Sequence, residues 1–151
     1  MRKTLIALFT LLAASAAIAQ QSNWWGGSAS GTGYPNQSTP VTASASGTTA
    51  AVTATLPGVL GKTTFICGFV MSSGGSTAAT AGNATVVGTI SGTMNFAYVD
   101  PAFAAGGGLL FVNFSPVCIP ASAQNTPIVV TQPAGGAGTL AAAVSTWGYQ
   151  L

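Results

Sequence analysis

Alternating apolar and polar residues indicate short β-strands along most of the chain. In the segment VTATL, the side chains of Val52, Ala54 and Leu56 alternate with threonines, which is the period-2 pattern of a strand that buries one face. The Pro-Gly pair that follows is a turn signal. We therefore expect a half-buried strand at residues 52–56.

The segment TTFICGFVM continues the alternation over residues 63–71. A strand has a side-chain period of two, so Phe65, Cys67, Phe69 and Met71 are predicted to share one face. This strand follows the first one after a short Gly-containing turn.

Similar patterns recur in the second half of the chain, where turn residues separate them. The Ser-Gly-Thr turn between the first two of these segments predicts a β-hairpin. Prolines between later segments rule out helix interiors there. Together, about seven or eight short strands predict an all-β fold: a single-domain antiparallel β-sandwich, jelly-roll-like, with an immunoglobulin-like sandwich as the alternative. Beyond the two strands above, the expected strands are residues 85–90, 94–99, 109–115, 128–131 and 139–149.

The N-terminus has the three parts of an export signal. Arg2 and Lys3 precede an apolar run over residues 5–18, which ends in a small-x-small alanine pattern. The run is shorter than the roughly 18 apolar residues that cross a bilayer as a helix. We expect residues 1–19 to be a cleaved signal peptide. The mature protein would then be secreted, periplasmic or at the cell surface, with no membrane span.

Residues 20–39 are rich in Gly, Ser, Asn and Gln and show no periodicity. This composition predicts a flexible leader, with the β-sandwich domain beginning at about residue 40 and running to residue 151. Trp24 and Trp25 in the leader are candidate contacts for a glycan or a protein partner, because indole rings stack well on apolar surfaces. The simpler interpretation is that the pair packs against the end of the sandwich.

The two cysteines, Cys67 and Cys118, are expected to form a disulfide because export leads to an oxidising compartment. Two separate buried thiols are the alternative. Neither cysteine has a His or a cationic neighbour in the sequence that would lower its pKa, so both interpretations make them structural.

Charge is almost absent after signal cleavage, because Lys62 and Asp100 are then the charged side chains that remain. A nucleic-acid surface needs clustered Lys and Arg, so no nucleic-acid partner is expected. The chain has no histidine, which excludes Ser-His-Asp and Cys-His catalysis. A single carboxylate cannot supply a glycosidase pair or a strong metal site. We therefore predict no enzymatic activity, no cofactor and no metal.

The Gly61-Lys62-Thr63 sequence looks like the end of a phosphate loop. That motif needs a further glycine five residues before Gly61 and a helix after the threonine. Leu56 occupies the first position, and a strand pattern follows. We expect Lys62 to lie at a solvated turn. Trp147 and Tyr149 share one face of the last expected strand, and we expect core or sheet-end packing for them.

A resemblance can be drawn from several segments together: Cys67-Gly68-Phe69, GNATVVGTISGTMNF, PVCIPASAQNT and the terminal WGYQL. This series resembles small, mostly uncharacterised β-rich proteins of bacteria and tailed phages, over about residues 48–151. The resemblance implies a β-rich fold and assigns no active residues. The signal sequence departs from virion proteins, which assemble in the cytoplasm.

These observations lead to a prediction of an exported, noncatalytic structural or interaction module that acts through its β-sandwich surface. Near-neutral, hydroxyl-rich surfaces lack charge repulsion between copies, which favours self-assembly or adhesion. Two alternatives remain. One is a carbohydrate-binding module that uses Trp24 and Trp25. The other is a phage-related structural protein.

Overall fold

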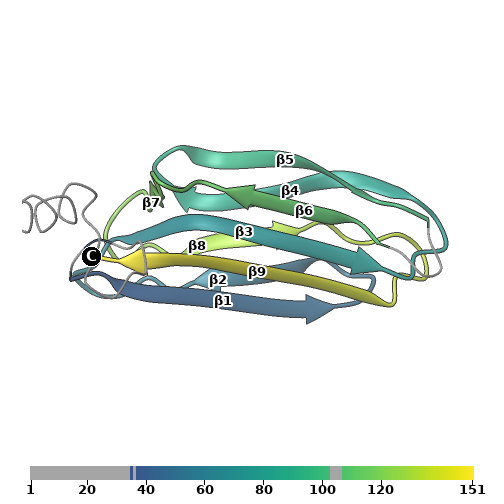
Figure 1. Cartoon of the computed structure of the whole chain (residues 1–151), viewed down its shortest axis with the longest axis horizontal. Helices are drawn as coiled ribbons and strands as arrows, with labels where there is room; N and C mark the ends of the chain where they lie inside the picture. The colour runs from purple at the N-terminus through teal and green to yellow at the C-terminus, as the bar shows by residue number, and fades with distance from the viewer. Residues whose placement is uncertain (1–34, 36, 103–106) are drawn as a thin grey trace, which may run out of the picture. The chain divides into compact units, whose positions relative to one another are not determined.

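The computed structural model describes residues 35, 37–102 and 107–151. All the described strands lie within one compact unit, residues 39–151 (Figure 1). The described residues form nine β-strands and no helix. The strands are β1 (Thr39–Gly47), β2 (Val52–Leu56), β3 (Thr64–Gly74), β4 (Thr80–Thr89), β5 (Gly92–Asp100), β6 (Leu109–Asn113), β7 (Ile119–Pro120), β8 (Ile128–Gln132) and β9 (Ala141–Gln150).

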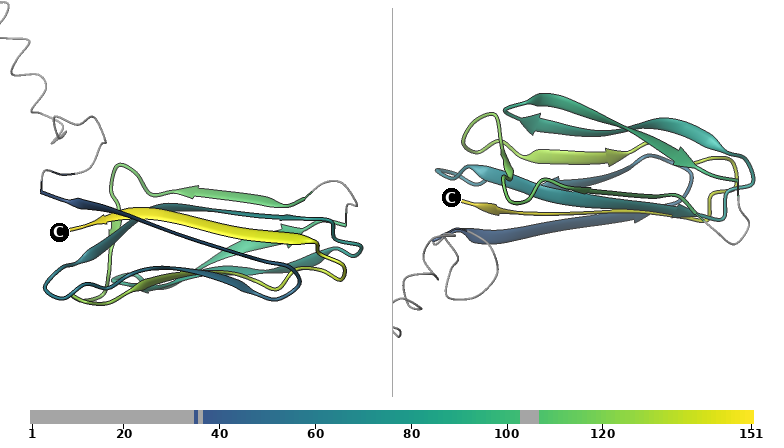
Figure 2. Two further views of the ribbon diagram at one scale, coloured as in Figure 1. Left: turned by 90° about the horizontal axis from the view of Figure 1, so that it is seen from below. Right: turned by 45° about the horizontal axis from the view of Figure 1, so that its top comes forward.

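These strands form two antiparallel sheets. The first sheet has the order β1-β9-β3-β6, with the short β7 also paired to β3, and the second has the order β2-β8-β4-β5. β9 runs between β1 and β3, as the yellow arrow in Figure 1 shows. The two views in Figure 2 show the sheets as two stacked layers. The predicted single-domain β-sandwich is therefore confirmed.

The strand pairing also settles the topology. β1 pairs with β9, β2 with β8, β3 with β6 and β4 with β5, so the first half of the chain pairs with the second half in reverse order. Two further pairs, β3 with β9 and β4 with β8, join these hairpin arms into the two sheets. The chain thus forms one long antiparallel hairpin whose paired arms are distributed over two sheets, and this topology is a jelly roll. The immunoglobulin-like alternative is wrong, because that fold keeps its first two strands in one sheet, whereas β1 and β2 lie in different sheets.

The hydrophobic core lies between the inner faces of the two sheets. Phe69 is fully buried there and makes an edge-to-face contact with Phe96, with ring centroids 5.3 Å apart. Burial of large apolar side chains of this kind contributes roughly 1.5–3 kcal/mol each. The core residues are Val52, Ala54, Leu56, Ile66, Phe69, Met71, Ala84, Val86, Tyr98, Ala121, Ile128, Val130, Ala142 and Val144.

A β-bulge in β3 overturns part of the predicted facing. The register against β9 shifts between Ile66 and Gly68, and an extra residue in one strand reverses the alternation beyond it. Ile66 is therefore buried on the same side as Phe69, while Phe65 lies on the outer face. The prediction that Phe65 shares a face with Phe69 and Met71 is wrong, because strict alternation cannot anticipate a bulge.

The sequence interpretation missed β1 and the two-residue strand β7. In β1, Val41, Ala43 and Ala45 face the core, and the residues between them are exposed. The alternation is present in the sequence, but alanine and serine are weak strand formers, so the signal is faint. The domain begins with Thr39 in this strand.

Candidate functional site

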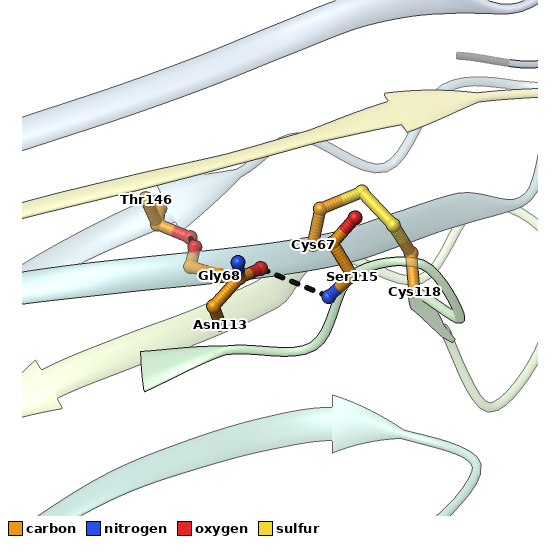
Figure 3. Close-up of a disulfide and its surroundings, with 6 residues drawn as sticks. All are labelled: Cys67, Gly68, Asn113, Ser115, Cys118 and Thr146. Atoms are coloured by element: carbon orange, nitrogen blue, oxygen red, sulfur yellow. Dashed lines mark hydrogen bonds between the residues drawn. A yellow bond between two sulfur atoms is a disulfide. The ribbon is translucent and has the colours of Figure 1, made fainter. Parts of the chain in front are cut away.

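The structure joins the two predicted disulfide residues. Cys67 and Cys118 are bonded at an S–S distance of 2.01 Å (Figure 3), so the alternative of two separate thiols is wrong. The bond closes a loop of 51 residues, which in the chain-entropy model stabilises the fold by about 4 kcal/mol. The candidate contacts Trp24 and Trp25 lie outside the described residues.

The disulfide holds the segment after β6 against the bulge of β3. On the same segment, the Phe114 backbone N–H donates to the Cys67 carbonyl at 2.8 Å, and the Ser115 N–H donates to Asn113 Oδ1 at 2.9 Å. On the opposite side, the Thr146 hydroxyl of β9 donates to the Gly68 carbonyl at 3.0 Å. Figure 3 shows the disulfide together with Gly68, Asn113, Ser115 and Thr146. The bulge is thus anchored from both neighbouring strands.

Lys62 lies in the turn between β2 and β3, as expected. Its ammonium donates to Thr39 Oγ1 at 3.0 Å, and its backbone carbonyl accepts from the Asn125 N–H at 3.0 Å. The next element is strand β3 rather than a helix. This geometry lacks the helix N-terminus that a phosphate loop requires.

Asp100, the one acidic side chain of the chain, is buried at the end of β5 with 1% of its surface exposed. Ser73 donates a hydrogen bond to Oδ1 at 2.6 Å. The Gly136 N–H and the Thr139 hydroxyl donate to Oδ2 at 3.1 and 3.0 Å. Burial raises the pKa of the Asp100 carboxyl, but hydrogen bonds from these groups and Ser76 lower the pKa by more, so the net shift is downward. The carboxylate therefore clamps β3, β5 and the loop after β8 together.

The hydrogen-bond network extends from Asp100 into the core. The Tyr98 hydroxyl donates to Ser73 Oγ at 2.7 Å, and Gln132 Nε2 donates to the Tyr98 oxygen at 3.3 Å and to the Ser72 carbonyl at 3.2 Å. Burial raises the pKa of Tyr98. Among the described residues, Gln132 Oε1 is the buried side-chain atom without a hydrogen-bond partner. Apart from Gln132 Oε1, the polar side-chain groups of this network hydrogen-bond inside the fold, as expected for a structural network.

The outer face of the first sheet carries four aromatic side chains that are not part of the core. We call this set the outer aromatic face; it consists of Phe65, Phe111, Trp147 and Tyr149. Phe65 and Tyr149 are cross-strand partners in β3 and β9, and their rings are stacked with centroids 4.7 Å apart. That separation equals the usual spacing between neighbouring strands, so the two rings stand side by side and cover each other's faces.

The second ring pair bridges a strand. Trp147 lies in β9 and Phe111 in β6, and β3 runs between them. Their rings are stacked with centroids 5.8 Å apart. Gly68 makes this possible, because a Cβ at that position would collide with the Trp147 ring and with the Val112 carbonyl. The glycine thus opens the space across which the indole reaches Phe111.

Polar side chains border the aromatic residues mainly at one edge of the sheet. The outward residues of the β1 edge are Thr42, Ser44 and Ser46, all exposed. At the β6 edge, the outward residues Leu109 and Phe111 are 72% and 61% exposed. The face therefore changes from hydroxyl-bearing at the β1 edge to mostly apolar at the β6 edge, where Asn113 is the exposed polar residue.

The expectation of core or sheet-end packing for Trp147 and Tyr149 is wrong in part. Both side chains are half-buried and lie on the outer surface of the sheet, away from the core between the sheets. Burial raises the pKa of the Tyr149 hydroxyl. Sequence reasoning missed their partners Phe65 and Phe111, because neither is near them in the chain and the register that joins them is nonlocal.

Comparisons with protein-family models, with curated proteins and with solved structures found no match for this chain. The jelly-roll assignment thus follows from the strand order alone. In the part of the chain that the structure describes, no helix has the length and apolar character needed to span a bilayer.

Proposed function

We propose that this protein is an exported, noncatalytic structural or interaction module that works through its outer aromatic face. The supporting observation is the placement of four aromatic rings on the outside of the first sheet, although the core between the sheets is already complete. Exposed apolar surface costs free energy in water, and contiguous patches of it mark interaction sites. Aromatic residues are also enriched in such interfaces.

The ring geometry favours an apolar, protein-like partner over a sugar. Stacking on a sugar needs an open ring face, and in the stacked Phe65–Tyr149 pair one face of each ring is covered by the other ring. Jelly rolls serve in capsid, lectin and other domains, so the fold alone does not choose between assembly and glycan binding.

The noncatalytic part of the proposal rests on the ionisable groups. Asp100 is buried and accepts hydrogen bonds from three different residues through its two oxygens. It therefore does not reach a substrate as a general base. Lys62 is engaged with Thr39 in a turn.

Export is proposed from the N-terminal signal pattern together with the Cys67–Cys118 bond. Disulfides of this kind persist in oxidising compartments. Mass spectrometry of the protein recovered from its native cells tests this part, with an N-terminus at about residue 20 expected. An intact residue 1 on protein recovered from the cytoplasm would contradict it.

A retention assay with matched variants tests the proposed surface. The purified mature protein is applied to octyl-agarose, cellulose and chitin. The Phe111→Ser/Trp147→Ser variant should lose retention, whereas Val87→Ser/Val129→Ser should not. This control removes a neighbouring apolar pair from the outer face of the second sheet. Loss on octyl-agarose alone supports protein-like contacts, and loss on cellulose or chitin supports a glycan ligand. Equal retention of both variants on every matrix would refute the proposed surface.

A further inference from the structure

β6 forms one edge of the first sheet, and among the described strands it pairs only with β3. In an antiparallel ladder, the backbone groups of successive residues point alternately to one neighbouring strand and to the other. The Phe114 N–H donates to Cys67 of β3, and the Gly108 carbonyl accepts from Ser73 of β3. The even-numbered residues of this segment therefore face β3.

It follows that the odd-numbered residues Leu109, Phe111 and Asn113 direct their backbone N–H and C=O groups toward the open edge. The same three residues have exposed side chains on the outer face. Within the described residues, no strand pairs with this row of backbone groups, and the exposed side chains of Leu109 and Phe111 lie beside it. Edges of this kind are templates for pairing with another strand.

The usual protection against such pairing is missing at β6. Natural edge strands are commonly guarded by charged side chains, especially Lys, or by Pro. The segment LLFVN contains neither a charged residue nor a proline. The two charged side chains that the structure describes lie elsewhere, because Lys62 is in the β2–β3 turn and Asp100 is buried. The opposite edge of the same sheet differs, because β1 is rich in Ser and Thr and carries Pro40.

We propose that β6 pairs with β6 of a second copy of this chain, antiparallel about a two-fold axis at Phe111. This inference rests on the proposed function and names its partner. Leu109 of each copy would face Asn113 of the other, and the two Phe111 residues would face each other. Roughly six backbone hydrogen bonds would join the two first sheets into one continuous sheet.

A second copy fits better than an unrelated charged partner for two reasons. The domain has almost no charge, so nothing repels an identical copy or attracts an oppositely charged protein. The edge-facing backbone groups of β6 belong to Leu109, Phe111 and Asn113, so they are arranged evenly about Phe111. A two-fold axis at Phe111 therefore brings each N–H of one copy opposite a C=O of the other. The Trp147–Phe111 stack would then continue across the axis into the matching stack of the other copy, since facing aromatic residues stabilise paired strands.

Light scattering and sedimentation across a concentration series of the mature protein test the pairing. The wild-type chain should form dimers. Phe111→Lys should raise the dissociation constant by about 100-fold or more, because two ammonium groups would face each other across the axis. The control is Ser44→Lys on the opposite edge, which should leave the dissociation constant within about threefold, as expected for an exposed site away from the interface.

A backbone variant separates strand pairing from simple contact between apolar faces. Leu109→Pro removes an N–H that points to the open edge and leaves the bonds to β3 in place, as edge prolines do. It should also weaken the dimer. Dimerisation that resists both Leu109→Pro and Phe111→Lys would overturn the inference.

Disulfide trapping tests the two-fold position directly. Facing residues that exchange both hydrogen bonds have Cα atoms about 5.5 Å apart, which lies within disulfide reach. Phe111→Cys should therefore give a covalent dimer under mild oxidation, with the Cys67–Cys118 bond retained in peptide mapping, and Ser44→Cys should not. If the wild-type chain stays monomeric but retention on octyl-agarose still depends on Phe111 and Trp147, the self-pairing fails and the proposed function stands. If that retention is unaffected, the proposed function fails with it.

Discussion

The outer faces of the two sheets follow the same alternation but carry different side chains. On the first sheet, cross-strand neighbours are aromatic, as with Phe65 and Tyr149. On the second, the corresponding neighbours include Thr53 and Thr131, whose hydroxyls are 3.1 Å apart. The second face also has an apolar pair, Val87 and Val129, but it carries no aromatic pair among the described residues. The aromatic rings on the first face lie on the outside of the sheet and are not part of the core between the sheets. We therefore place the function on this face.

The difference also shows where stability and function separate. The inner faces of both sheets are filled by apolar residues that the fold requires. The outer faces do not have to fill the core, so their residues can differ between the two sheets. The predictions below test this contrast, from the largest expected effect to the smallest.

The disulfide joins β3 of the first sheet to the segment after β6 and makes no bond to the second sheet. Its removal should give the largest loss of stability among these variants. Cys67→Ala/Cys118→Ala should lower the free energy of unfolding by about 4 kcal/mol, because the unfolded chain regains the entropy of an open loop. Urea titration followed by tryptophan fluorescence measures this change. An unchanged midpoint would mean that the bulge is held by its hydrogen bonds alone.

The Asp100 clamp should make stability depend on acid. Its pKa is lowered in the folded state, so its stabilising contribution is present above the unfolded pKa and is lost as the pH falls through the folded value. Because no other Asp or Glu exists in the chain, the pH dependence of unfolding below about pH 5 should come from this group and the C-terminus. Thermal unfolding measured from about pH 6 to pH 2 follows the loss.

Asp100→Asn provides the matched variant for that titration. It should cost about 2 kcal/mol at neutral pH, since the hydrogen bonds to a charged acceptor weaken, and it should flatten the acid dependence. A variant that keeps the wild-type pH profile would show that the clamp does not control the acid response.

The gap at Gly68 should matter for the aromatic face but not for the opposite sheet. Gly68→Ala places a Cβ against the Trp147 ring and the Val112 carbonyl, and overpacking of this kind costs about 1–3 kcal/mol. The tryptophan emission should shift as the indole is displaced. The control is Ala97→Val, which enlarges an exposed position in β5 of the second sheet and should change stability by less than about 0.5 kcal/mol.

Much of the fold could be predicted from local patterns, because inward-facing residues alternate wherever a strand has one buried face. This holds for β2, β6, β5 and the second half of β4, whereas residues 80–84 of β4 lie outside the expected strand at 85–90. The export context predicted the disulfide. The alternation failed at two points. In β3 the bulge reversed the facing after Ile66, and in β1 alanine and serine gave too weak a signal.

The candidate site could not be predicted, for a different reason. Phe111 and Trp147 are brought together by the register of three strands and by the missing side chain of Gly68. Register in a jelly roll is set by pairs from opposite halves of the chain, and no local pattern encodes it. The same is true of the hydrogen bonds to Asp100, which come from strand β3 and from the loop after β8, far apart in sequence.

Hydrogen exchange of the full mature chain at low and high protein concentration tests the central claim most directly. The account predicts that the backbone amides of Leu109, Phe111 and Asn113 gain protection as concentration rises, because they enter a contact at the apolar edge of the outer aromatic face. The amides of β5 at the edge of the second sheet should not change. Concentration-dependent protection in β5 together with unchanged exchange in β6 would contradict the account.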